Sequence, residues 1–320
     1  MNFVSSKRNY AIDWLRVFAM FTVFLFHCAR FFDRQDWHVK NPQSDTIITF
    51  IVLFLVQWIM PLFFILSGIS SYYSLGFRKA GEYVRGRFKR LMLFVFSLLT
   101  LPFFIYIQRE PEPTFISKFI SFLERKGTLF LLALPLAALE MLLDPATIGR
   151  RDFGGWSPFL YLIFFIYGYV VLTEHRLQRI AQKQRNITLA GGLITATTAL
   201  AILISKGFPE FGSAYFFFMT IIRAFNTWLW LLAIIGFGLH YCNFNNKFLA
   251  YANEAVLPFY ILHQTIIVTI AFYLIGLYIP VGIKYFIIAS TSMIAILALY
   301  EIFIRRLNIL RFLFGLRPKT

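Results

Sequence analysis

The chain has 320 residues, of which 59% are apolar and only 14% are charged. A soluble domain is typically about 45–50% apolar and about 25% charged, so this composition excludes an ordinary soluble enzyme, a disordered chain and a fibrous repeat. Lys and Arg number 31 against 15 Asp and Glu, which gives a formal net charge of +16. These cations lie between long apolar runs, which is the positive-inside pattern of a polytopic membrane protein, and they give no reason to expect nucleic acid as a partner.

Nine apolar runs have lengths suited to helices that cross a bilayer, for which about 20 residues are needed. They cover residues 11–32, 46–75, 91–108, 128–143, 156–173, 187–205, 215–239, 256–279 and 285–300. The runs are continuous and do not alternate, which favours helices over barrel strands. The sequence therefore predicts an all-α, polytopic helical bundle that forms a single membrane-embedded domain over residues 1–320. The second run is expected to break at Pro61, Ser67 and Gly68.

The distribution of basic residues conflicts with nine crossings. Lys7 and Arg8 place the N-terminus in the cytoplasm, and the first run is interpreted as a retained span and not as a cleaved signal peptide. The basic segments at 176–185 and 305–319 then fall on the outer side, where they violate the rule. One more crossing between Gln108 and Thr128 removes the conflict. Either the segment from Thr114 to Leu123 re-enters the membrane, or a span is absent.

The first run carries four ionisable residues, Asp13, Arg16, His27 and Arg30, although charge inside a span is costly and indicates function. Arg16 and His27 are eleven residues apart, so on a helix they lie within about 20° of one face and about 16 Å apart along the axis. A neutral imidazole can remove a proton from a hydroxyl near pH 7, and a guanidinium suits an anion. Structural alternatives are an Asp13–Arg16 pair, a snorkelling Arg30 and a helix–helix hydrogen bond from His27.

Four segments in chain order resemble the membrane acyltransferase-3 family. DWLRVFAMFTVFLFHCARF (13–31) is similar to its Arg-x10-His signature, and FFILSGIS (63–70) to its Ser-Gly-Phe motif, with Ile69 in place of the Phe. RGRFKRL (85–91) matches its basic stretch, and NEAVLPFYILHQTII (253–267) resembles its closing segment with a Tyr and a His. Within that family, the chain most resembles the stand-alone branch, which includes a protein that succinylates glucans. Relatives have ten spans, and a Gly-His-Leu-Trp-Phe-Leu-like span is not found between Gln108 and Thr128.

The resemblance implies an acyl-CoA-dependent O-acyltransferase of the bacterial inner membrane. Such an enzyme moves an acetyl or succinyl group from acyl-CoA, a co-substrate, to a hydroxyl of a cell-envelope or exported glycan or glycolipid. Neither a metal nor a permanently bound cofactor is expected. The site residues that it implies are, for catalysis, His27 and Arg16; for binding the donor, Arg85, Arg87, Arg90 and Ser67; and for other contacts, Asp13, Arg223, Tyr260 and His263.

Each of these roles has a structural alternative. The cationic loop is also what the positive-inside rule alone would produce, and Ser67 with Gly68 also suits close helix packing. Arg223 contacts an anionic donor or snorkels, and His263 either serves the site or makes a structural hydrogen bond. A different class of function also remains open, because intramembrane Arg and His residues also occur in a transporter or flippase for a lipid-linked sugar or another anion.

Overall fold

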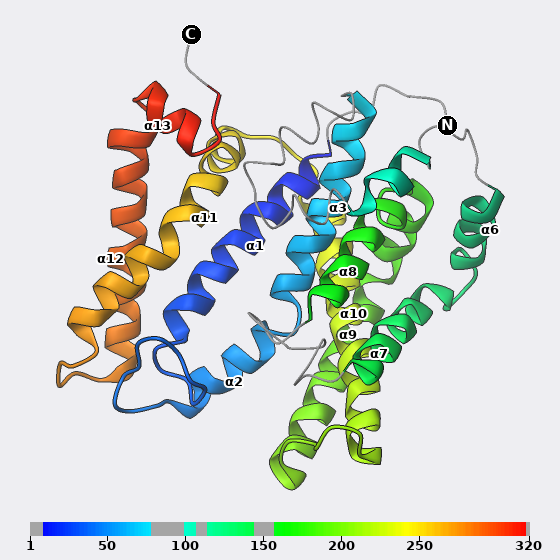
Figure 1. The fold of residues 1–320 in the computed structure, drawn as a ribbon, viewed down its shortest axis with the longest axis horizontal. Helices are drawn as coiled ribbons and strands as arrows, with labels where there is room; N and C mark the ends of the chain where they lie inside the picture. Colours follow the sequence, from blue (N-terminus) through cyan, green and yellow to red (C-terminus); the bar gives the residue numbers. More distant parts are fainter. Residues whose placement is uncertain (1–8, 78–98, 107–113, 144–156, 318–320) are drawn as a thin grey trace. The chain divides into compact units, whose positions relative to one another are not determined.

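The computed structural model describes residues 9–77, 99–106, 114–143 and 157–317, and these residues form helices and loops without a strand (Figure 1). Contacts between Cα atoms divide the chain into two compact units. The first unit takes residues 1–15 and 60–243, and the second takes residues 16–59 and 244–320. The two units are described separately below, and the prediction of a single domain stays a prediction.

The helices of the described residues have the following bounds. They are α1 (Tyr10–Ala29), α2 (Thr46–Leu55), α3 (Ile59–Phe77), α6 (Thr114–Leu123), the 3₁₀ helix η1 (Thr128–Leu132), α7 (Ala133–Leu142), α8 (Pro158–Val170), α9 (His175–Lys206), α10 (Ala214–Tyr241), α11 (Lys247–Leu274), α12 (Val281–Leu299), the π-helix η2 (Tyr300–Ile304) and α13 (Asn308–Leu313). A further helical stretch covers 99–106.

Six helical segments of the described residues are long and apolar enough to cross a membrane. They are Tyr10–Ala29, Thr46–Gly76, His175–Lys206, Ala214–Tyr241, Lys247–Leu274 and Val281–Ile304. The segments Thr128–Leu142 and Pro158–Val170 are apolar but shorter. The prediction of an all-α, multi-pass membrane protein is therefore confirmed.

The position of the break in the second run was predicted wrongly. The helix is interrupted by a turn at 56–58, and it continues without a break through Pro61, Ser67 and Gly68. Pro61 lies in the first turn of α3, where a helix needs no backbone N–H from it. The turn itself consists of Val, Gln and Trp, so it carries no Gly or Pro signal in the sequence.

Two helices begin earlier than the apolar runs indicate. The basic segment 176–185 is not a loop but the first third of α9, because Arg, Lys and Gln favour helices although they end an apolar run. With 32 residues, α9 is about 48 Å long and exceeds the roughly 30 Å hydrocarbon core. Helix α11 begins at Lys247, nine residues before the predicted 256, where the Asn246 side chain accepts a hydrogen bond from the Leu249 backbone N–H at 2.7 Å.

The segment between Gln108 and Thr128 contains a short helix. Helix α6 has ten residues and is therefore about 15 Å long, which is half of the distance needed to cross a bilayer. The described residues thus supply no additional crossing there, and residues 107–113 lie outside them. The conflict in the charge distribution stays open.

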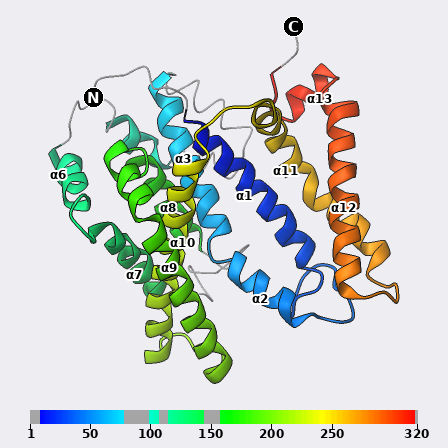
Figure 2. The ribbon, with the colours of Figure 1, turned by 180° about the vertical axis from the view of Figure 1, so that it is seen from behind.

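In the first unit, α10 packs against α9 and α7, and α3 packs closely on α8 (Figures 1 and 2). Gly68 of α3 and Gly168 of α8 make this approach possible. A Cβ atom at Gly68 would overlap the backbone carbonyl oxygen of Phe165, and one at Gly168 would overlap that of Ile65. Both glycines therefore let two backbones meet directly, as small residues do between membrane helices.

In the second unit, α11 lies between α1 and α12 in both views (Figures 1 and 2). The rings of Phe24 on α1 and Phe259 on α11 meet edge to face, with centroids 5.4 Å apart. About one turn earlier on α11, Ala255 packs with Tyr300 and Ile304 of η2 in a small buried cluster. This packing fixes the face of α11 that carries His263 against the face of α1 that carries His27.

Candidate active site

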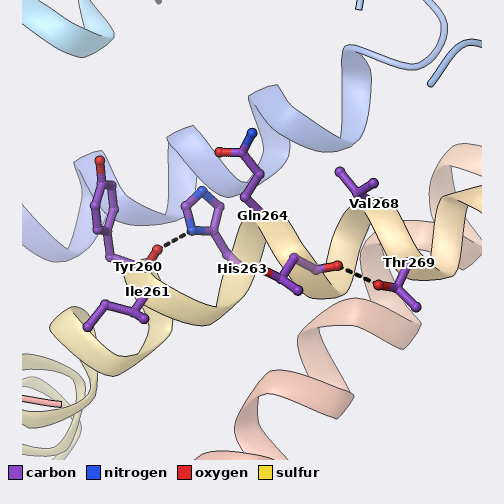
Figure 3. Close-up of a pocket in the computed structure, with 7 residues that line it drawn as sticks. Tyr260, Ile261, His263, Gln264, Val268 and Thr269 are labelled. Carbon is purple, nitrogen blue, oxygen red and sulfur yellow. Dashed lines mark hydrogen bonds between the residues drawn. The ribbon is translucent and has the colours of Figure 1, made fainter. Parts of the chain in front are cut away.

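Two imidazoles from distant parts of the sequence meet in the second unit. His27 lies two residues before the end of α1, and His263 lies in the middle of α11. Their ring centroids are 5.2 Å apart. Figure 3 shows His263, Tyr260 and Gln264 on the side of α11 that faces α1. The predicted candidates His27, Tyr260 and His263 are thus brought together, although 236 residues separate the two histidines in the chain.

The hydrogen bonding of His263 fixes which of its nitrogens is the acceptor. Its Nδ1 lies 2.6 Å from the Tyr260 carbonyl oxygen, and a carbonyl only accepts, so the ring donates from Nδ1. In the neutral ring Nε2 then carries the lone pair, and this atom is buried without a hydrogen-bond partner. The Nδ1 atom of His27 is also buried without a partner. Buried polar atoms that lack partners are uncommon and call for an explanation, such as a ligand.

A cavity of about 570 Å³ opens along the middle of α11. Its lining is Tyr260, Ile261, His263, Gln264, Thr265, Val268 and Thr269 (Figure 3). Four of these seven side chains are uncharged and polar beside an imidazole, which is an unusual surface for a membrane-spanning helix. Gln264 and Thr265 were missed in the sequence, because uncharged polar residues interrupt an apolar run too weakly to be noticed.

Arg16 lies on the same helix as His27, as expected, and its side chain is partly buried. The helical geometry places it about 16 Å from His27 along the axis and near the same face. The lining of the cavity on α11 contains neither Arg16 nor His27. Their sharing of one polar cavity therefore stays a prediction.

Arg30 belongs to a buried ionic network and does not snorkel. Its side chain is 8% exposed and pairs with the fully buried carboxylate of Asp33, which also receives Lys40 Nζ at 2.6 Å. Asp33 and Lys40 carry no signal in the sequence that predicts this network. Both lie in the loop after α1, where charged residues are usual and carry no signal of burial.

Three predicted residues lie in the first unit, each in surroundings of its own. Asp13 and Ser67 are buried, and Gly68 beside Ser67 makes the tight contact with α8, which supports helix packing for that motif. Arg223 donates to a carboxylate oxygen of Glu140 on α7 at 2.8 Å. Glu140 was not recognised as its partner, because 83 residues separate the two.

The predicted donor-binding residues Arg85, Arg87 and Arg90 lie outside the described residues. Within the described ranges, no group of three or more His, Cys, Asp or Glu could hold a metal ion. The two cysteines, Cys28 and Cys242, are free. Burial raises the pKa of the Cys242 thiol, which disfavours the reactive thiolate.

The described residues form a helical, multi-pass protein in which two imidazoles meet near the end of the first span. Comparisons with known sequences agree with a membrane protein of this kind. The family described as acyltransferase domain, acyltransferase family 3, matches residues 9–124, which include Arg16 and His27. The first part of the chain is therefore similar to this family of acyltransferases.

Proteins named glucans biosynthesis protein C are also similar to this chain. The protein of Escherichia coli K12 is 32% identical over 111 residues, which are 34% of this chain and 29% of the relative. The protein of Shigella dysenteriae serotype 1 is 24% identical over 391 positions, which cover 99% of this chain and 97% of the relative. That of Salmonella paratyphi B is 23% identical over 380 positions with the same coverage. No solved structure matches.

The lengths of these alignments concern the additional crossing that the distribution of basic residues requires between Gln108 and Thr128. The alignment with the Shigella protein has 391 positions against 320 residues here, so at least 71 positions of it have no counterpart in this chain. The absence of a span between Gln108 and Thr128 stays a prediction, because the alignment length does not place these positions along the chain.

Proposed function

We propose that this protein transfers an acyl group, acetyl or succinyl, from acyl-CoA to a hydroxyl of a cell-envelope or exported glycan. The donor reaches the site from the cytoplasm of a bacterial cell, where the N-terminus lies, and the acceptor reaches it from the outer side of the inner membrane. The observation that carries the proposal is the pair of His27 and His263, two imidazoles with buried, unpartnered nitrogens in a chain whose first part matches an acyltransferase family.

His27 is the general base. Its imidazole takes the hydrogen of the acceptor hydroxyl as the hydroxyl oxygen forms a bond to the thioester carbonyl carbon. The carbon–sulfur bond then breaks, and the coenzyme A thiolate leaves with the bonding electrons and receives the proton from the imidazolium. No proton is gained or lost over the whole transfer.

His263 supports this proton transfer. Because Nδ1 donates to the Tyr260 carbonyl oxygen, only Nε2 of His263 can accept a hydrogen bond. An acceptor on the neighbouring ring stabilises the positive charge that His27 gains in the transition state, as the third group of a catalytic triad does.

The cations supply the donor site. Arg85, Arg87 and Arg90, together with Ser67, bind the phosphates of acyl-CoA, because Arg forks match phosphate oxygens bidentately. Arg16 holds a donor phosphate or sets the electrostatic potential around His27. Arg223 is left out of the donor site, because Glu140 already pairs with its guanidinium.

The test is an assay with radiolabelled acetyl-CoA or succinyl-CoA and glucose oligosaccharides on membranes that contain the protein. We expect wild type to label the saccharide, and His27→Ala and Arg16→Ala to lower the rate by a factor of about 100 or more. His175→Ala is the matched control, because His175 is exposed at the start of α9. Transfer that is absent in wild type, or unchanged in His27→Ala, would contradict the proposal.

A further inference from the structure

The loop after α1 has a defined conformation, because a buried carboxylate braces it. Asp33 is fully buried between Arg30 and Lys40, whose Nζ lies 2.6 Å from the carboxylate. Arg30 also donates to Gln35 Oε1 at 2.9 Å and to the Asp36 carbonyl oxygen at 2.8 Å. Lys40 Nζ also donates to the Arg30 carbonyl oxygen at 2.9 Å, so the network links the end of α1 to residues 33–40.

A second anchor holds the same loop to α12. Lys284 is 4% exposed, and its ammonium donates to Asn41 Oδ1 at 2.7 Å and to the Ile275 carbonyl oxygen at 2.6 Å. Asn41 in turn donates its backbone N–H to the Phe31 carbonyl oxygen at 2.9 Å. A buried lysine is held only by good acceptors, so this contact fixes the end of the loop.

Trp37 is the residue that this braced loop presents to the site. The Arg30 guanidinium lies over its ring at 4.7 Å, and the His27 ring lies beside it with centroids 5.6 Å apart. The indole Nε1–H of Trp37 is buried and has no hydrogen-bond partner. Its neighbour His27 also has a buried nitrogen without a partner.

Trp58 shows that an unpartnered indole alone does not mark a site. Its Nε1 is also buried without a partner, but its ring packs between Phe18 and Phe54, with centroids 6.1 and 6.0 Å away. Trp37 differs because its ring lies beside two imidazoles, His27 and His38, and a guanidinium, and not beside phenyl rings.

We propose that Trp37 binds the acceptor: its indole N–H donates a hydrogen bond to the sugar hydroxyl oxygen, and the hydrogen of that hydroxyl points to His27. An indole only donates, and a lone pair on an imidazole only accepts. A hydroxyl does both, whereas a carboxylate or a phosphate dianion has no hydrogen to give to the imidazole.

The inference rests on the proposed function and adds the residue that selects a hydroxyl as the acceptor. During transfer, the hydroxyl oxygen uses one electron pair to bond the thioester carbon, and its hydrogen passes to His27. The coenzyme A thiolate leaves with the electrons of the carbon–sulfur bond. The indole keeps its hydrogen throughout and holds the oxygen in place.

The first arm of the test compares Trp37→Phe with Trp58→Phe in nanodiscs. Both variants keep an aromatic ring and remove a buried indole N–H. We expect Trp37→Phe to raise the KM for a glucose oligosaccharide about tenfold and to leave the KM for the acyl-CoA donor within twofold of wild type. Trp58→Phe should change neither constant. An unchanged acceptor KM in Trp37→Phe overturns the inference.

The second arm needs no turnover and uses the wild-type protein labelled with ¹⁵N at its six indoles. The signal that is missing in Trp37→Phe belongs to Trp37, and we expect it to move downfield when the saccharide is added without donor. A signal that moves in a protein that transfers no acyl group refutes the proposed function and supports acceptor binding at Trp37. A signal that stays in place at saturating saccharide overturns the inference.

Discussion

The substitution Asp33→Asn tests the ionic network that shapes the candidate site. Asp33 has no exposed surface, and it is the carboxylate on which both Arg30 and Lys40 converge. Removing one partner of a buried ion pair costs about 3–5 kcal/mol. Here the cost is smaller, at about 2–3 kcal/mol, because the Lys40 side chain is 28% exposed and Arg30 keeps its contacts to Gln35 and Asp36.

The assay is the apparent melting temperature of the purified protein in detergent. At about 1.5 °C per kcal/mol for a chain of 320 residues, Asp33→Asn should lower it by about 3–5 °C. The matched control is Glu301→Gln, whose partner Arg305 lies at 3.0 Å while both side chains are about 40% exposed. That change should cost less than about 1 kcal/mol. A melting temperature of Asp33→Asn equal to that of the control would show that the carboxylate does not brace the loop.

Two further predictions concern packing and topology. Gly68→Ala should destabilise the protein by about 1–3 kcal/mol, because the added Cβ overlaps the backbone of α8. Gly76→Ala is the control and should not destabilise the protein, because open space surrounds Gly76. Thermal melts compare the two variants. Lys183→Cys, at an exposed position of α9, should react with an impermeant maleimide only from the cytoplasmic side, because the basic start of α9 follows the positive-inside rule. Labelling from the outer side of intact cells would show that no additional crossing lies between Gln108 and Thr128.

The sequence predicts the spanning helices well where hydrophobicity alone decides. Runs 11–32 and 215–239 correspond closely to Tyr10–Ala29 and Ala214–Tyr241. It fails where a helix continues into polar residues, as at the start of α9, because an apolar run reports burial in lipid and not helix formation. It also fails at the turn 56–58, where the residues carry no turn signal.

The site was predictable only in part. His27 is conspicuous because an imidazole in a span is costly, but nothing local connects it with His263, 236 residues away. The burial of Asp33 and the position of Trp37 beside His27 depend on how a loop folds back on a helix end. Loops have no hydrophobic period, so the residues that shape this site cannot be found by their spacing.

The central claim is that His27 and His263 act together in acyl transfer, and a double-mutant cycle tests it most directly. The turnover number is measured for His27→Gln, His263→Gln and the double variant with saturating acyl-CoA and saccharide. Each single change should lower kcat by a factor of 10²–10⁴. The double variant should be no more than about tenfold slower than the slower single variant, because residues that act as a unit are not additive. A loss equal to the product of the two single losses, or full activity in either single variant, would contradict the claim.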